Sequence, residues 1–191
     1  VNYTLEVDPI VPVALGWDPG VTHEGTVGYT NLDGAAGDYF FQVTTANPSL
    51  GGWRVALHLL NTNDADLYLK RGTLPTPATA DYKSERTGAD GVVLGMPSQF
   101  QPGEDWYLLV RAREGAQWRL VSGSPYVKDL GPVAADGSSG SGPVEVGPEG
   151  IRFFSATATA EMLAWRLWLN GAPNTVMVKR TSVPLPIAGG S

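Results

Sequence analysis

The alternation of apolar and polar positions is clearest in residues 53–71, and the rest of the chain is organised around this stretch. In residues 53–59 every second position is apolar, and the same period of two returns in residues 67–69. A period of two is typical of a strand that buries one face. Residues 61–64 (Asn-Thr-Asn-Asp) separate the two runs and favour a turn. The pattern predicts a β-hairpin with an oxygen-rich, acidic turn.

Further strand patterns follow every 8–15 residues or so, separated by clusters of Gly, Pro, Asn and Asp. Residues 39–45 alternate with Tyr39, Phe41 and Val43 on one face, and residues 106–111 form the most apolar run. No window shows sustained helical periodicity. Frequent short strands without helices predict an all-β protein, an antiparallel β-sandwich or jelly roll. The other expected strands are residues 2–7, 91–94 and 117–121.

Parts of this pattern recur about 115 residues later in a degraded form. A period of this length is a domain, because solenoid repeats are only about 20–50 residues long. We therefore expect the last strand of a preceding repeat in residues 1–8, a complete sandwich in 9–124, and a second, partial sandwich in 125–191. The echoes are Tyr3-Thr4-Leu5 with Trp118-Arg119-Leu120, Leu15-Gly16 with Leu130-Gly131, Phe40-Phe41 with Phe153-Phe154, Trp53-Arg54-Val55 with Trp165-Arg166-Leu167, and Leu69-Lys70-Arg71 with Val178-Lys179-Arg180.

Composition removes several classes of function. The net charge of −6 argues against nucleic acid and anionic membranes as partners. No apolar run approaches the roughly 20 residues of a membrane helix, so we expect no membrane insertion. The chain has no cysteine, which excludes disulfides and cysteine nucleophiles. Its two histidines, His23 and His58, lie outside any nucleophile or zinc motif, so we expect no catalytic residues and no enzyme.

The order of five segments carries a family resemblance. They are Tyr39-Phe40-Phe41, Trp53-Arg54-Val55, Asp64-Ala65-Asp66-Leu67-Tyr68-Leu69, Glu104-Asp105-Trp106-Tyr107-Leu108-Leu109-Val110 and Trp118-Arg119-Leu120. In this order they resemble the bacterial pre-peptidase C-terminal domain, over residues 25–122 and more weakly over 144–186. The resemblance implies a non-catalytic jelly-roll module of secreted proteins, often in tandem. It also implies that some relatives bind calcium at the aspartate strand, and others collagen or polysaccharide.

Calcium is the cofactor that the residues themselves suggest. Asp64 and Asp66 lie two apart in an extended segment and so point to the same side, with Asn63 and Asp33 as further oxygen donors. Calcium prefers six to eight such oxygens. The alternative is that Asp64 is only a turn residue and Asp66 only a solvated one. The second repeat has lost both carboxylates at this turn, so it is not expected to bind.

Two tyrosines are candidate ligand-binding residues. Tyr68 and Tyr107 are expected on the sides of their strands opposite the core, where they could stack on sugar rings or peptide. The alternative is ordinary packing between neighbouring strands. The tryptophans that alternate with Val and Leu are expected in the core instead: Trp53, Trp106, Trp118 and Trp165.

The leading hypothesis is a non-catalytic β-sandwich module of a secreted or cell-surface bacterial protein that serves spacing, adhesion or assembly. A carbohydrate- or protein-binding accessory module of an exocellular hydrolase is the alternative. Expected partners are other copies, neighbouring domains of a longer chain, polysaccharide or extracellular protein. The second repeat has no equivalent of residues 106–111 and 118–121, so an apolar face and an edge are expected to be open. Strand donation by another chain and a longer array both remain open as explanations.

Overall fold

The computed structural model describes residues 9–17, 28–31, 37–48, 50–134 and 152–160, together with Ala164 and Leu167. These ranges form eleven strands and no helix, so they contain no helix that could cross a membrane. The all-β prediction is confirmed. In chain order the strands are β1 (Val13–Ala14), β2 (Gly28–Asn31), β3 (Gly37–Thr44), β4 (Gly52–Leu59), β5 (Ala65–Arg71), β6 (Tyr82–Ser84), β7 (Asp90–Gly95), β8 (Asp105–Ala112), β9 (Trp118–Gly123), β10 (Val127–Pro132) and β11 (Phe153–Thr157).

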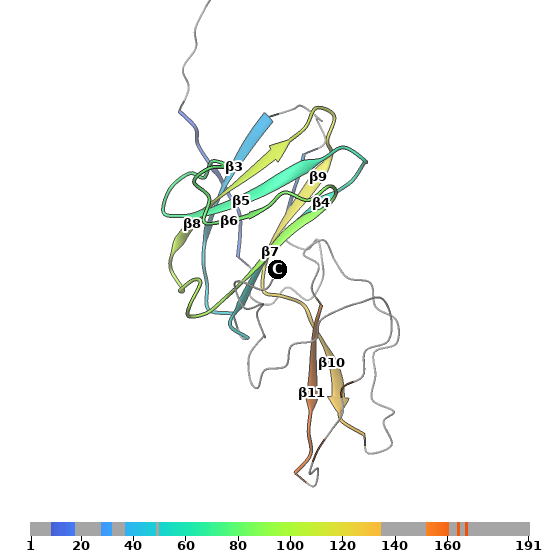
Figure 1. Cartoon of the computed structure of the whole chain (residues 1–191). Helices are drawn as coiled ribbons and strands as arrows, with labels where there is room; N and C mark the ends of the chain where they lie inside the picture. The colour runs from blue at the N-terminus through green and yellow to red at the C-terminus, as the bar shows by residue number, and fades with distance from the viewer. Residues whose placement is uncertain are drawn as a thin grey trace, which may run out of the picture.

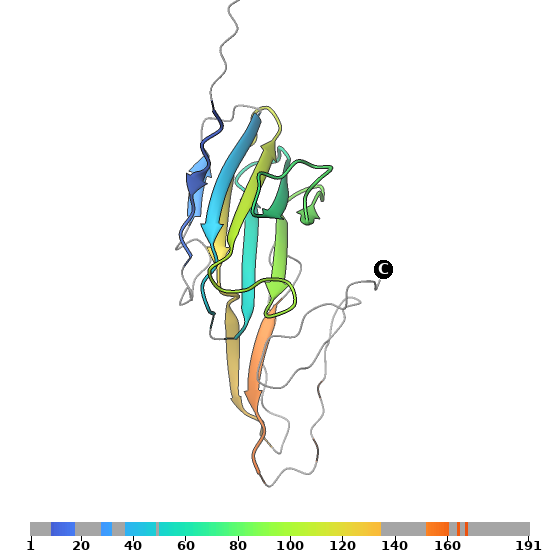
Figure 2. The ribbon, with the colours of Figure 1, turned by 90° about the vertical axis from the view of Figure 1, so that its left-hand side faces the viewer.

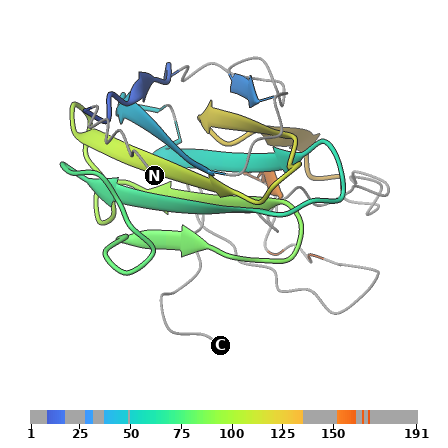
Figure 3. The same ribbon diagram turned by 90° about the horizontal axis from the view of Figure 1, so that it is seen from above.

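Strands β1 to β9 form a two-layered sandwich, as Figures 1 and 3 show. One sheet has the strand order β1-β3-β8-β5-β6, and the facing sheet has the order β2-β9-β4-β7. Every neighbouring pair in the sandwich is antiparallel except β1 and β3, which are parallel. The predicted β-sandwich is therefore confirmed.

The predicted hairpin in residues 53–71 is wrong, although both of its strands form. Strand β4 lies between β9 and β7, whereas β5 lies between β8 and β6 in the other sheet. Leu57 and Leu69 are both fully buried because each apolar face covers the other sheet. In a hairpin the two would lie side by side on one sheet and leave that layer uncovered. The loop of residues 60–64 is long enough to cross between sheets about 10 Å apart. Strands β8 and β9 also lie in different sheets, so the loop between them likewise crosses from one sheet to the other.

The core between the sheets is built around tryptophan. Trp53, Trp106 and Trp118 have at most 1% of their surface exposed, which confirms the prediction for these three side chains. The rings of Trp53 and Trp106 meet edge to face across the two sheets, with centroids 5.4 Å apart. Phe41 meets Trp118 in the same way at 5.9 Å. Trp165 lies outside the described residues.

Strands β10 and β11 form a separate parallel pair that extends from one end of the sandwich (Figure 2). Only residues 124–126 separate β9 from β10, so the boundary predicted near residue 125 falls between these two strands. The Ser155 hydroxyl donates a hydrogen bond of 3.0 Å to Asp129 Oδ1 across the pair. The predicted strand at residues 2–7 lies outside the described residues.

Candidate functional site at the acidic corner of the sandwich

The loop that enters β5 is fixed by two asparagine side chains. Asn61 Nδ2 donates to the Gly115 carbonyl at 2.6 Å, and Asn63 Nδ2 donates to the Glu114 carbonyl at 3.2 Å. These bonds join the two loops that cross between the sheets. Gly115 has a φ of +76°, and a Cβ on it would lie 2.6 Å from Asn63 Nδ2. The predicted metal ligand Asn63 therefore acts as a clamp between loops, and a side chain at position 115 would break that clamp.

Asp64 sits at the end of this loop and is held by three groups. Its Oδ2 lies 3.4 Å from Arg113 Nη2, and its Oδ1 accepts a 3.3 Å hydrogen bond from the Gly88 backbone. Its carbonyl accepts a 3.0 Å bond from the Arg113 backbone. These contacts fit a turn residue, which was one of the two interpretations of the sequence, and the calcium interpretation stays a prediction.

Asp90 is a buried carboxylate at the same corner. Its Oδ1 accepts hydrogen bonds from the Ser84 hydroxyl and, at 3.1 Å, from the Arg86 backbone. Its Oδ2 is buried and has no hydrogen-bond partner. A carboxylate oxygen buried in this way costs free energy when it is ionised, and burial accordingly raises the pKa of Asp90.

Asp66 lies on the outer face of β5 and shares this electrostatic environment. Partial burial raises the pKa of its carboxyl, and the negative charges of Asp64, Asp90 and Glu85 raise it further. The result is a corner with four acidic side chains, whose charges are partly offset by Arg113, Arg86 and Lys83. At Asp66 and Asp90, burial and the neighbouring carboxylates outweigh these positive charges, because the pKa of each is raised.

Sequence reasoning missed Asp90 and Glu85 at this corner. The pairing of β5 with β6 sets Leu67 opposite Ser84, and the Ser84 hydroxyl then binds Asp90. The two acids lie about 20 residues beyond the aspartate strand, so no local spacing connects them to it. An Asp at the start of a short apolar strand was the only available signal.

The predicted calcium ligands do not form a ready-made cage. Within the described ranges, no group of three or more His, Asp or Glu side chains is arranged to hold a metal ion. Asp64 and Asn63 are engaged as described above, and Asp33 lies outside these ranges. At this corner, the Asp66 carboxylate and Asp90 Oδ2 are the oxygens whose negative charge is least offset by hydrogen bonds and ion pairs. A calcium ion here would need further oxygens, such as backbone carbonyls, to complete its shell.

The two candidate tyrosines have different environments. Tyr68 is only 2% exposed, and its hydroxyl donates a 2.9 Å hydrogen bond to Glu85 Oε1. Burial raises the pKa of Tyr68, and this bond raises it further. Tyr68 therefore presents no face for stacking. Tyr107 is half-buried on the outer face of β8, directly between Gln42 and Lys70 on the neighbouring strands.

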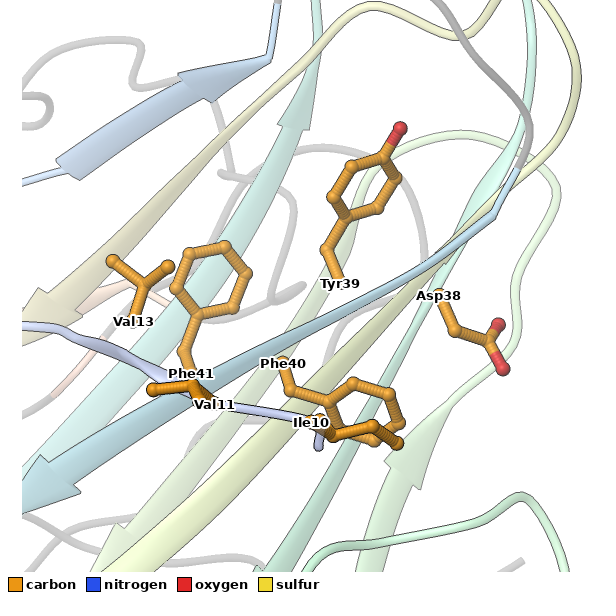
Figure 4. Close-up of a pocket in the computed structure, with 7 residues that line it drawn as sticks. All are labelled: Ile10, Val11, Val13, Asp38, Tyr39, Phe40 and Phe41. Carbon is orange, nitrogen blue, oxygen red and sulfur yellow. The ribbon is translucent and has the colours of Figure 1, made fainter. Parts of the chain in front are cut away.

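A shallow groove runs beside strand β3 (Figure 4). Ile10 and Phe40 both line the groove, as does Val11, and Val13 lines it from β1 itself. The charged lining residue, Asp38, is held by Arg111 through bonds of 2.8 and 2.7 Å, and this pairing lowers the pKa of Asp38. Apart from this ion pair, the groove is lined by aliphatic and aromatic residues.

Comparison with known proteins finds solved structures with low sequence identity to this chain. No protein-family profile matches the chain, and no curated protein matches it. The pre-peptidase C-terminal domain of a collagenase from Bacillus anthracis is 11% identical, with a TM-score of 0.41 over 61% of this chain and 99% of that domain. An insecticidal delta-endotoxin from Bacillus thuringiensis is 14% identical, with a TM-score of 0.27 over 50% of this chain and 19% of the toxin. Similarities this low say nothing about function, and the fold described above rests on the strand topology alone.

Proposed function

We propose that this chain is a non-catalytic β-sandwich module, built in tandem, of a secreted or cell-surface bacterial protein. It serves spacing, adhesion or assembly there. The observation that carries the proposal is the recurrence of one strand pair in the same register. A second start of the same sandwich, directly behind the first, is what a tandem module requires.

The register is the same relative to the echoed dipeptides. In the first pair Ala14 precedes Leu-Gly and lies opposite Gln42, which follows Phe-Phe. In the second pair Asp129 precedes Leu-Gly and lies opposite Ser155, which again follows Phe-Phe. A slip of one residue would have moved each side chain to the other face. The sequence echo and the strand pairing therefore support the same alignment of the two repeats.

The direction of the pairs adds to this support. Among the strand pairs in the described residues, only β1–β3 and β10–β11 are parallel. Parallel neighbours need a long crossover, and each pair has one of about 20 residues. Such a pairing is unusual in a protein made mainly of antiparallel strands. Two occurrences with similar crossovers favour a common origin over chance.

Cysteine cross-linking tests the repeated register, since the natural chain contains no cysteine. The double variants Ala14→Cys with Gln42→Cys, and Asp129→Cys with Ser155→Cys, should each form an internal disulfide on mild oxidation. Controls displaced by two residues, Ala14→Cys with Thr44→Cys and Asp129→Cys with Thr157→Cys, should keep free thiols. Thiol titration in denaturant reads the result. A disulfide in the first pair but none in the second would remove the support for a tandem module.

The alternative function is a carbohydrate- or protein-binding accessory module. Tyr107 is the residue that favours it, because its ring is partly accessible on the outer face of β8. A polysaccharide and glycan array probed with the whole chain separates the two. The spacing and assembly role predicts no binding that depends on Tyr107. Saturable binding that is lost in Tyr107→Ala but kept in Tyr126→Ala would favour the alternative, since Tyr126 is an exposed tyrosine on another element.

A further inference from the structure

Strand β11 has an open edge without the usual protection. Its five residues, Phe-Phe-Ser-Ala-Thr, include no charge and no proline. Strand β10 pairs with one edge, and no described strand pairs with the other. By contrast, the outer strands of the larger sheet are protected: β1 is two residues long and follows Pro12, and β6 is three residues long and carries Lys83. Short length, proline and lysine are common ways to prevent edge pairing. Strand β11 has no proline or lysine, and its five residues make it longer than β1 and β6.

The face of β11 beside this edge is also open. Phe154 is 43% exposed, whereas its equivalent Phe41, under the proposed tandem alignment, is 4% exposed. Phe41 is covered by Trp118 from the facing sheet. Ala156, two residues further along the same face of β11, is exposed as well. The open edge, with its backbone hydrogen-bonding groups, therefore lies beside an exposed apolar side chain.

The first sandwich shows which direction a partner takes. The edge of β3 that faces away from β1 is filled by β8, which runs antiparallel to it. The matching edge of β11 should therefore accept an antiparallel strand. Two copies of one strand that meet edge to edge about a two-fold axis perpendicular to the sheet are antiparallel by symmetry.

We infer that β11 is a self-association edge, which pairs antiparallel with β11 of a second copy of this chain. Ser155 lies at the centre of the strand, so the two-fold axis passes beside it and each Phe154 is set opposite Ala156 of the partner. The two pairs then form one four-stranded sheet with both Phe154 rings on the same face. A large side chain beside a small one fills this face without a clash. The inference rests on the tandem alignment for the choice of edge.

The expected association is weak and depends on salt. The contact between the two β11 strands, which we call the seam, is only five residues long. It buries less than the roughly 1,000 Å² of a stable interface, so the dimer should dissociate on dilution. Each copy carries a net charge of −6, and the two copies repel each other at low ionic strength. The seam itself carries no charge, so salt should screen the repulsion without weakening the contact.

Sedimentation of the whole chain from about 5 to about 500 µM, in low and in moderate salt, tests the inference. We expect a monomer that shifts towards dimer with concentration, and more strongly with salt. Phe154→Lys and Ala156→Lys should each weaken the dimer at least about tenfold by placing like charges at the seam. Tyr126→Lys is the matched control, because Tyr126 is 44% exposed at the same end of the sandwich but not on β11. It should leave the dimer unchanged.

A single cysteine locates the seam. Ser155→Cys should give a disulfide-linked dimer on oxidation, since the axis brings the two side chains together, and Tyr126→Cys should not. A chain that stays monomeric throughout the range overturns the inference, as does a dimer that persists in Phe154→Lys. Neither result affects the internal Asp129–Ser155 cross-link, so failure of self-association is distinguishable from failure of the tandem module.

Discussion

The strand pairs β1–β3 and β10–β11 share direction and register but differ in what surrounds them. In the first pair, β8 continues the sheet and the second sheet covers the inner face. In the second pair, the described residues provide neither. Phe41 is consequently buried, and Phe154 is not. The comparison teaches that strand pairs with the same direction and register can bury their aromatic side chains to different extents, depending on which strands and which sheet cover them.

The largest expected effect separates these two phenylalanines directly. Phe41→Ala should cost about 3–5 kcal/mol of the free energy of unfolding, because it empties a buried aromatic site. Phe154→Ala should change it by no more than about 0.5 kcal/mol in dilute solution, where the residue is exposed. Urea unfolding followed by tryptophan fluorescence measures both. A large loss in Phe154→Ala at low concentration would mean that β11 is covered within its own chain.

Calcium would sharpen the comparison, because the acidic corner lies in the first region. We propose that an ion binds at Asp66 and Asp64 and relieves the repulsion that the Asp66 carboxylate feels from its acidic neighbours. At a hundredfold excess over its dissociation constant, calcium would then stabilise the fold by about 2.7 kcal/mol. The melting temperature should rise with calcium, fall again with chelator, and lose this response in Asp66→Asn. Asp129→Asn, in the second region, should keep the response. A melting temperature that does not change with calcium would mean that Asp64 and Asp66 have a structural role only.

The pH dependence of stability provides a further test of the corner. Asp66 and Asp90 have raised pKa values in the folded state, so the stability they contribute is present below pH 3.8 and is lost as the pH rises through those values. Asp38 has the opposite sign, because its pKa is lowered and its contribution is lost as the pH falls below 3.8.

Asp90→Asn should therefore flatten the decline of stability just above pH 3.8, because the amide cannot ionise. Asp38→Asn should change how the free energy of unfolding depends on pH only below about pH 3.8, where Asp38 becomes protonated. Urea unfolding at steps from about pH 3 to pH 7 separates the two contributions. An unchanged profile in Asp90→Asn would show that its buried oxygen is solvated in the folded protein.

The smallest expected effect concerns the two tyrosines. Tyr68→Phe should cost about 1 kcal/mol, because it removes the hydrogen bond to Glu85 from a buried ring. Tyr107→Phe should be nearly neutral, since its ring is half-buried on the outer face of the sheet. Chemical denaturation of the matched pair is sufficient. Equal costs would mean that Tyr107 has a structural role and is not available for ligand.

Local pattern determined where the strands lie and which side chains they bury. The alternation in residues 39–45, 53–59 and 106–111 correctly placed Phe41, Trp53 and Trp106 in the core, because successive side chains of a strand point to opposite faces of the sheet. The repeat of Leu-Gly and Phe-Phe dipeptides predicted two related segments, but it predicted neither strand β1 nor strand β10 nor their parallel pairing.

Only the tertiary structure decided which strands are neighbours. An alternating run describes one strand and its faces but not its partner, so β4 and β5 were expected to pair although they lie in opposite sheets. The acidic corner depends on the same long-range choice. Asp64 and Asp66 lie two residues apart in sequence, whereas Asp90 and Glu85 reach them only because β6 pairs with β5. Sheet order is set by how two apolar faces cover each other across the whole domain, and that balance is not visible in any local stretch of the chain.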